Sequence, residues 1–377
     1  MPDNETETKI IEIENFKLEN GRTLKNVQIA YETAGTLNPE KNNAILIFHA
    51  LSGSAHITGL NKNFKNKFWQ DDCHTGWWDS FVGPKKIIDT EKHFVICQNV
   101  LGGCYGTTGP SSINPRTGKE YGKTFPEISV GDMARLQKLT LEKIGINELN
   151  AIIGASLGGY IAQEYIMQFG YSVKKAAIVA SSSKTSALNK LHGLEQILAI
   201  ENDPQFFSGN YYGQGKPHKG LMLARMIAHK SYVDIDTIIN RAKEETILPD
   251  DYFYNYRLMH HIESYMFHQG KKFVKRFDAN TYLLITKAIQ HFDIAKKYGN
   301  GSLEKAFAKS NATNPEYLIA SINSDVCFYP EEQKAMVQAL EKAGKTPQYF
   351  TVDSDKGHDS FLLEQEKYGF LKEFLES

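Results

Sequence analysis

The pentapeptide Gly154-Ala155-Ser156-Leu157-Gly158 decides the fold, because it follows an apolar run and opens a segment with helical spacing. It matches the pattern Gly-x-Ser-x-Gly, in which a serine sits on a sharp turn from a strand into a helix. Composition alone would produce such a pentapeptide in roughly one chain in ten of this length. Its context is more specific, since LNAII (149–153) precedes it and a helix is expected over 157–169. We therefore predict that Ser156 is a nucleophile rather than an incidental serine in a glycine turn.

The residues around Ser156 also suggest how a reacting oxygen would be held. A serine in a strained turn needs neighbours without side chains where the strand and the helix pass closest. The turn directs the first amides of the helix toward the reacting oxygen, so the Leu157 amide is one predicted oxyanion donor. In proteins with a Gly-x-Ser-x-Gly turn of this kind, a second oxyanion donor comes from the loop after an early strand. Here FHALSG (48–53) follows AILIF, which makes the Leu51 amide the candidate.

Other short apolar runs predict strands that are buried on both faces. They are AILIF (44–48), HFVIC (93–97), AAIV (176–179) and YLIA (317–320). Helical patterns that end before a glycine are expected over 132–144, 157–169 and 331–343. This order predicts an α/β protein, an α/β-hydrolase fold with a mostly parallel central sheet. Residues 9–33, around Asn20-Gly21, predict an antiparallel hairpin at its edge.

The alternation of strands and helices stops between about residues 183 and 311. Aromatic and charged sequence with a helical appearance takes over there, for example HHIESYMFHQGKKFVKRF. We interpret this stretch, 183–311, as an inserted helical cap domain. The α/β-hydrolase core then comprises residues 1–182 and 312–377, and a chain of 377 residues is long enough for both parts.

The remaining members of a catalytic triad can be located by their order along the chain. In this fold an acid follows a late strand, and a histidine lies in a loop before the last helix. Asp325 follows YLIASINS, and His358 lies between QYFTV and a helix expected over 360–375. His358 would accept the proton of Ser156, while Asp325 would fix its tautomer and stabilise the imidazolium. Asp353 and Asp355 are alternative acids, and His358 could be an ordinary loop residue.

Composition excludes several classes of partner. Forty-three basic and forty-four acidic residues give a net charge of −1, which provides no overall field for nucleic acid or anionic lipid. Small molecules are therefore the expected partners. The chain starts with polar residues and has no apolar run of membrane-spanning length. We therefore expect neither export nor a membrane anchor.

The cysteines and histidines argue against a metal site. The four cysteines lie far apart without a C-x-x-C pair, which disfavours disulfides and zinc and favours a reducing cytoplasm. They are Cys73, Cys97, Cys104 and Cys327. His49 and His56 could be a metal pair, but no third ligand lies at a plausible spacing, so we expect structural roles and no metal.

Longer stretches resemble one known family. Asn99–Asp132, NVLGGCYGTTGPSSINPRTGKEYGKTFPEISVGD, closely resembles the homoserine O-acetyltransferase family of methionine biosynthesis. So do HALSGSAHITG, GWWDSFVGP, RFDANTYL, SDVCFYPEEQ and GHDSFLLE, and the similarity runs from about residue 25 to the C-terminus. The resemblance implies a ping-pong reaction in which Ser156 takes an acyl group from acyl-coenzyme A and passes it to the hydroxyl of L-homoserine.

The resemblance also implies substrate contacts and an assembly. Arg225, in GLMLARMIAH, would bind the carboxylate of homoserine, and Asp359 would hold its ammonium group. A solvated arginine and a helix N-cap are the alternatives for these two residues. The resemblance further implies a homodimer formed through the cap and no cofactor beyond acetyl-coenzyme A as co-substrate.

The chain departs from the family pattern at the pocket. The family often has Gly-Ser-Met-Gly-Gly where Ala155-Ser156-Leu157-Gly158-Gly159 stands here, and an aspartate where Ser54 stands. Relatives use succinyl-coenzyme A or accept serine. A succinyl donor needs a cation for its carboxylate, and residues 326–328 after the acid supply none, which favours acetyl. A carboxylic-ester hydrolase and a non-catalytic binding protein are the competing interpretations.

Overall fold

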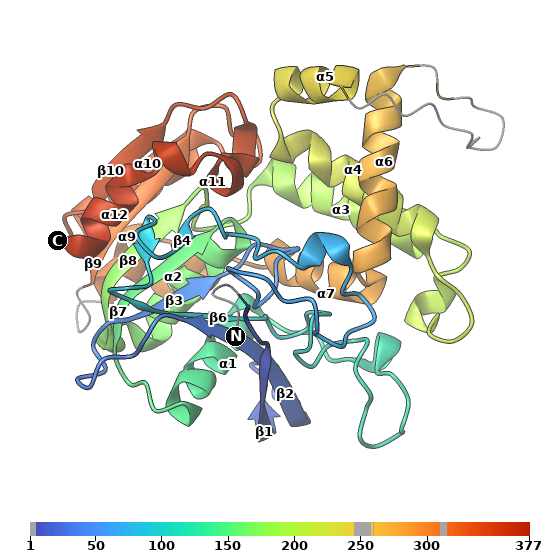
Figure 1. Cartoon of the computed structure of the whole chain (residues 1–377), viewed down its shortest axis with the longest axis horizontal. Coiled ribbons are helices and arrows are strands. Elements are labelled where there is room, and N and C mark those ends of the chain that lie inside the picture. Colours follow the sequence, from blue (N-terminus) through green and yellow to red (C-terminus); the bar gives the residue numbers. More distant parts are fainter. Residues whose placement is uncertain (1–4, 245–257, 259, 310–314) are drawn as a thin grey trace.

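The computed structural model describes residues 5–244, 258, 260–309 and 315–377, and an eight-stranded sheet forms its centre (Figure 1). The strand order is β1-β2-β6-β3-β7-β8-β9-β10. Strands β1 (Lys9–Lys17) and β2 (Thr23–Ala34) form the predicted hairpin, and β2 pairs antiparallel with β6 (Phe94–Gln98). All other pairs in this sheet are parallel. They involve β3 (Ala44–Phe48), β7 (Leu149–Ala155), β8 (Val173–Val179), β9 (Glu316–Ile322) and β10 (Gln348–Val352).

Both faces of this sheet are buried, as the continuous apolar runs predicted. In β3, Leu46 and Phe48 belong to one apolar cluster, whereas Ile45 and Ile47 belong to another. The first cluster also contains residues of α1 (Val130–Lys143), α2 (Leu157–Phe169) and α10 (Pro330–Lys342). The second contains residues of α12 (Gly369–Glu376) and Trp78, which lies before the short parallel pair β4 (Val82–Gly83) and β5 (Ile88–Asp89). Alternate side chains of one strand therefore support two helical layers.

The prediction of a single helix over residues 360–375 is wrong. The structure has α11 (Ser360–Leu363), a 3-10 turn at Gln365–Lys367 and α12. Glu364 leaves the helical conformation with φ −123° and ψ 60°, and its carboxylate accepts hydrogen bonds from the hydroxyls of Ser354 and Ser360. Hydrogen bonds to the Glu364 side chain hold this residue outside the helical conformation and so interrupt the helix. Gly369, a weak helix former, follows five residues later.

The described residues between β8 and β9 form seven α-helices and no strand. The helices are α3 (Ala187–Glu201), α4 (His218–Tyr232), α5 (Ile235–Glu244), α6 (His261–Arg276), α7 (Ala279–Gln290), α8 (Ile294–Gly299) and α9 (Leu303–Lys309). Figure 1 shows α3 to α6 grouped to one side of the sheet. Residues of α3, α4, α6 and α7, among them Leu221 and Phe273, share an apolar cluster with Trp69, Cys104 and Tyr105 from the loops of the core.

The last two of these helices pack differently. Ile294 of α8 and Ala306 of α9 belong to the first core cluster, the one that contains residues of α1, α2 and α10. The predicted boundary between residues 311 and 312 lies outside the described residues, so it stays a prediction. From this packing we propose that α8 and α9 count with the core. Among the described helices, none is long and apolar enough to cross a membrane.

Candidate active site

Ser156 lies at the sharp turn between β7 and α2. Its backbone has φ 58° and ψ −125°, which a residue with a side chain adopts only where its surroundings impose it. The Ser156 amide donates to the Val179 carbonyl at 3.1 Å, and the Ser181 hydroxyl donates to the Ser156 carbonyl at 2.8 Å. These two bonds to the end of β8 hold the strained turn in place.

Close backbone contacts explain the glycines beside Ser156. A Cβ atom on Gly158 would lie 2.1 Å from the carbonyl oxygen of Phe48, the last residue of β3. One on Gly154 would lie 2.1 Å from the carbonyl oxygen of Gly158. Both distances are far inside van der Waals contact, so only glycine fits. The first turn of α2 therefore packs directly against the end of β3. Phe48, the residue in contact, lies three residues before Leu51.

The two predicted oxyanion donors lie on either side of this contact. Leu157 is the first residue of α2, and Leu51 lies in the loop after β3. Neither amide donates a hydrogen bond to any other residue that the structure describes. Both N–H groups are therefore available to a substrate oxygen, and the start of α2 adds its favourable dipole.

His358 and Asp325 form a buried pair. His358 Nδ1 lies 2.7 Å from Asp325 Oδ2, and the two residues are 3% and 1% exposed. The other carboxylate oxygen of Asp325 accepts hydrogen bonds from the amides of Cys327 and Phe328, each at 2.8 Å. The imidazole packs against the rings of Phe328 and Phe361, with centroids 5.2 Å away in each case. Both partners are thus fixed in position.

The two alternative acids face other groups. Asp353 Oδ1 accepts from the side chain of Asn323 at 2.6 Å, and Asp355 forms an ion pair with Lys356 at 2.9 Å. Asp325 is therefore the carboxylate that the structure brings to His358, and the histidine is a buried residue rather than an ordinary loop residue.

The surroundings of His358 suit a general base. Burial alone lowers the pKa of its imidazole, but the charge and hydrogen bond of Asp325 outweigh burial and raise that pKa above its usual value. His358 Nε2 is buried without a hydrogen-bond partner in the described part of the chain. Ser156, Asp325 and His358 follow the carboxyl ends of β7, β9 and β10. Because these strands are parallel, all three residues lie at one edge of the sheet.

Asp359 lies next to His358 and directly precedes α11. Its side chain makes no capping hydrogen bond, so helix capping does not explain it. Burial raises the pKa of its carboxyl above the usual value, while the charges of His358 and Arg225 oppose that rise. Asp359 is therefore close enough to Arg225 for their charges to interact.

Arg225 extends from α4 toward this region. Its guanidinium carbon lies 5.0 Å from the ring centroid of Phe273 and 5.3 Å from that of Tyr232. The Tyr232 ring in turn lies 6.0 Å from the imidazole of His358. Two aromatic rings thus hold the arginine, which is not a freely solvated side chain. Tyr232 and Phe273 could not be predicted from the sequence, because their contacts with Arg225 depend on how the cap helices meet the core.

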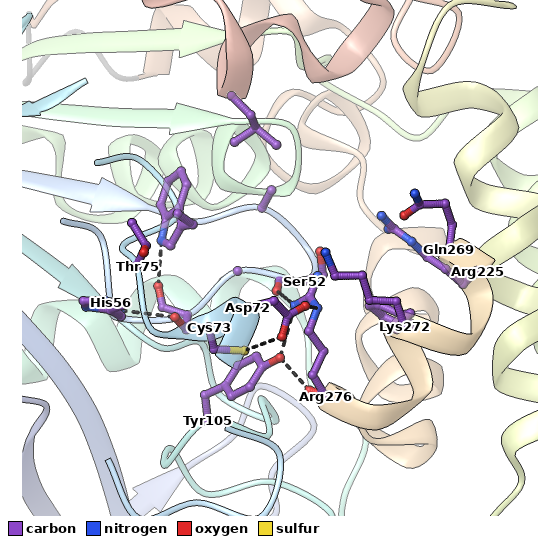
Figure 2. A pocket seen from close by; sticks show the side chains of 16 residues that line it. Ser52, His56, Asp72, Cys73, Thr75, Tyr105, Arg225, Gln269, Lys272 and Arg276 are labelled. Carbon is purple, nitrogen blue, oxygen red and sulfur yellow. Dashed lines mark hydrogen bonds and ion pairs between the residues drawn. The ribbon is translucent and has the colours of Figure 1, made fainter. Parts of the chain in front are cut away.

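A cavity of about 290 Å³ lies beside these residues (Figure 2). Ser156 and His358 do not line it, but Arg225 and Leu362, four residues after His358, do. Figure 2 shows Arg225, Gln269 and Lys272 on one side of the cavity and His56, Cys73 and Tyr105 on the other. The cavity therefore lies between the cap helices and the loops of the core.

The lining of this cavity carries more positive than negative charge. Arg225, Lys272 and Arg276 face a single carboxylate, Asp72, which lies 3.3 Å from the Nε of Arg276. Arg276 also donates to the Ser52 carbonyl at 3.4 Å and so joins α6 to the loop after β3. Such a lining favours an anionic ligand. Lys272 and Arg276 were missed, although their spacing of four residues on a helix was a usable signal.

The surroundings of His56 and Cys104 suit neither a metal ligand nor a nucleophile. The described residues contain no group of three side chains that could hold a metal ion. His56 lies 2.9 Å from the buried carboxylate of Glu32, which gives it a structural role. Cys104 is buried, and burial holds the pKa of its thiol well above the usual value, so it stays protonated and is a poor nucleophile.

The chain is similar to known proteins over most of its length. A family model described as "alpha/beta hydrolase fold" matches residues 43–365. The chain is 45% identical to the homoserine O-acetyltransferase of Methanococcus vannielii over 371 residues, 98% of this chain and 73% of that protein. It is 43% identical to the homoserine O-succinyltransferase of Neisseria gonorrhoeae over 352 residues, 93% of this chain and 90% of that protein.

Two crystal structures are similar over nearly the whole chain. The homoserine O-acetyltransferase from Bacillus anthracis gives a TM-score of 0.85 at 30% identity, with 99% of this chain and 98% of that chain covered. Esterase E22 gives a TM-score of 0.86 at 27% identity, with 98% of this chain and 100% of that chain covered.

Proposed function

The chain belongs to the homoserine O-acetyltransferase family of the alpha/beta hydrolase fold, and on that premise we propose that it moves an acetyl group from acetyl-coenzyme A to the hydroxyl of L-homoserine. The observation that carries the proposal is the buried Asp325–His358 pair, which lies at the same sheet edge as the strained Ser156. A fixed histidine whose Nε2 has no partner among the described residues, at the same sheet edge as a strained serine, suits acyl transfer by a catalytic triad.

The proposed reaction has two halves. His358 Nε2 removes the proton of Ser156 as its oxygen attacks the thioester carbonyl, and the amides of Leu51 and Leu157 hold the oxyanion. Collapse of this intermediate breaks the carbon–sulfur bond, and the thiol leaves with the proton from His358. The homoserine hydroxyl then gives its proton to His358 and attacks the acyl-serine. Ser156 recovers the proton, and the product is O-acetyl-L-homoserine.

Homoserine, the acyl acceptor, and acetyl-coenzyme A, the acyl donor, would bind to different charged residues. The fork of Arg225 suits the planar carboxylate of homoserine, and Asp359 suits its ammonium group. Lys272 and Arg276 would attract the phosphates of coenzyme A at the cavity, and no other cofactor or metal is proposed. The described cysteines are all free, which supports our proposal of a reducing, cytoplasmic location.

We also propose a homodimer through the cap. The exposed leucines of α3 are spaced by three, three and four residues, which places them on one helical face. They are Leu188, Leu191, Leu194 and Leu198. The buried Gly193, Gln196 and Ile200 lie on the opposite face. An exposed apolar stripe of this kind favours a protein partner, and Leu191→Glu should shift sedimentation toward the monomer. The control Ile113→Glu changes an equally exposed apolar residue away from α3 and should not.

The test of the activity follows free thiol and acylated product with acetyl-coenzyme A, with and without L-homoserine. We expect sustained thiol release and O-acetyl-L-homoserine that both depend on homoserine and are lost in Ser156→Ala; without homoserine, only the single burst of thiol from acylation of Ser156 is expected. Sustained thiol release without homoserine would favour a hydrolase, as esterase E22 is by its name. Faster turnover of succinyl-coenzyme A would favour the activity named for the Neisseria relative. Substituting L-serine tests the acceptor.

A further inference from the structure

His49 is a buried histidine that the reaction described above does not use. It directly follows β3 and is 1% exposed. It lies two residues before Leu51, the proposed oxyanion donor that is not part of α2. A buried polar side chain at this place needs a reason, because burying an imidazole is unfavourable unless its nitrogens are hydrogen-bonded.

Both ring nitrogens of His49 have partners. The amide of Val100 donates to His49 Nε2 at 3.0 Å, and His49 Nδ1 lies 2.7 Å from the carbonyl oxygen of Ala50. An amide can only donate and a carbonyl can only accept, so the proton of the neutral ring is on Nδ1. The imidazole therefore joins the loop after β3 to the loop after β6, the strand beside it.

The Ala50 carbonyl belongs to the same peptide unit as the Leu51 N–H. The described chain contains no cis peptide bond, and in a planar trans peptide the carbonyl and the N–H point in opposite directions. A bond that fixes the direction of the Ala50 carbonyl consequently fixes that of the Leu51 N–H. We propose that His49 is a positioning residue, which aims the Leu51 amide at the oxyanion by holding the Ala50 carbonyl.

Three further observations agree with this role. The Gly53 amide donates to the same Ala50 carbonyl at 3.0 Å, which closes a turn with Leu51 and Ser52 in its centre. A Cβ atom on Gly53 would lie 2.8 Å from the Cβ of His49, so the turn wraps tightly around the histidine. Burial also lowers the pKa of His49 to about 4, which keeps this hydrogen-bond arrangement intact at neutral pH.

The inference rests on the proposed acyl transfer and deepens it. His49→Asn keeps a donor near the position of Nδ1, whereas His49→Gln keeps an acceptor near the position of Nε2. Leu51→Pro removes the amide hydrogen itself at the second position of a turn, where proline is common. His93→Gln is the matched control, because His93 is also buried but lies before β6, at the opposite end of the sheet.

Turnover number and the KM for homoserine are measured for the folded variants in the thiol assay. His49→Gln should lower kcat by about 10- to 100-fold, with little change in KM, since losing one oxyanion donor costs on the order of 100-fold. His49→Asn should lose less, and His93→Gln should keep the wild-type kcat. The double variant His49→Gln/Leu51→Pro should be no slower than Leu51→Pro alone, because His49 acts through that amide.

Independent, multiplicative losses in the double variant would overturn the proposal, and so would an unchanged kcat in His49→Gln. If His49→Gln does not fold, His49→Ala, which also lacks the donor at Nδ1, carries the same comparison. The failure of the inference is distinct from that of the proposed function. Wild-type transfer that requires Ser156 would establish the function even if every His49 variant kept its kcat.

Discussion

At the scale of single residues, the proposed mechanism depends on the protonation state of His358. Asp325 raises the pKa of this imidazole, and only the neutral ring can accept a proton from Ser156. We therefore expect kcat/KM to fall as the pH drops through that pKa. Asp325→Asn removes the charge that raises it, so the acid limb should move to lower pH while the plateau falls by about 10⁴-fold. A pH–rate profile with an unmoved acid limb would contradict this role.

The proposed roles of Arg225 and Asp359 in binding homoserine can be tested separately from acylation. Arg225→Ala and Asp359→Asn should each raise the KM for homoserine by about 10- to 100-fold, because each removes a charge-assisted hydrogen bond to the substrate. The burst of thiol from acetyl-coenzyme A without homoserine should persist. Lys230→Ala, an exposed position on the same helix as Arg225, serves as the control. A lost burst with an unchanged KM would place both residues elsewhere in the mechanism.

At the scale of elements, the contact between α2 and β3 shapes the site. Gly158→Ala would force a Cβ against the Phe48 carbonyl, so it should lower the free energy of unfolding by about 1–3 kcal/mol and reduce activity. A Cβ on Gly369, at the start of α12, would meet no atom within 4 Å. Gly369→Ala should change stability by less than about 0.5 kcal/mol. Equal effects of the two substitutions in urea denaturation would refute the steric argument.

Sequence predicted the elements well where burial alone determines them. The runs at Ala44–Phe48 and Leu157–Phe169 match β3 and α2, because strands buried on both faces and a helix ended by glycine leave clear patterns. The helix over 360–375 failed because the bonds from Ser354 and Ser360 to Glu364 involve a side chain that no periodicity reveals.

The same distinction holds for the site. The order of Ser156, Asp325 and His358 along the chain was enough to nominate them, since each follows a strand of one parallel sheet. Tyr232, Phe273 and the Ala50 carbonyl could not be found in this way. Their relevance depends on the packing of the cap on the core and on the direction of one peptide group.

At the scale of the whole molecule, buried neutral histidines make the fold sensitive to acid. Burial lowers the pKa of His49 to about 4 and that of His229, in the cap, to about 3. The unfolded chain, with histidine pKa values near 6.5, then binds more protons than the folded chain below that pH. Stability should fall as the pH drops from about 6.5 to about 4, by about 3 kcal/mol for His49 alone. His358 opposes this trend, because a raised pKa stabilises the folded form at low pH.

Urea denaturation at pH 7.5 and pH 5 measures this effect. The denaturation midpoint should fall at pH 5 in the wild type and fall less in His229→Gln, which has no buried imidazole there to protonate. His291→Gln changes an exposed histidine and should behave as the wild type. A wild-type midpoint that rises on acidification would show that the raised pKa of His358 dominates instead.

The acyl-enzyme itself provides the most direct test of the central claim, that Ser156 carries the acyl group to homoserine. The protein is mixed with acetyl-coenzyme A alone, digested and examined by mass spectrometry, and a second sample is chased with L-homoserine before digestion. We predict one acetyl group on the peptide that contains Ser156, which the chase removes as O-acetyl-L-homoserine. An acetyl group on another residue, or one lost to water as fast as to homoserine, would contradict the account.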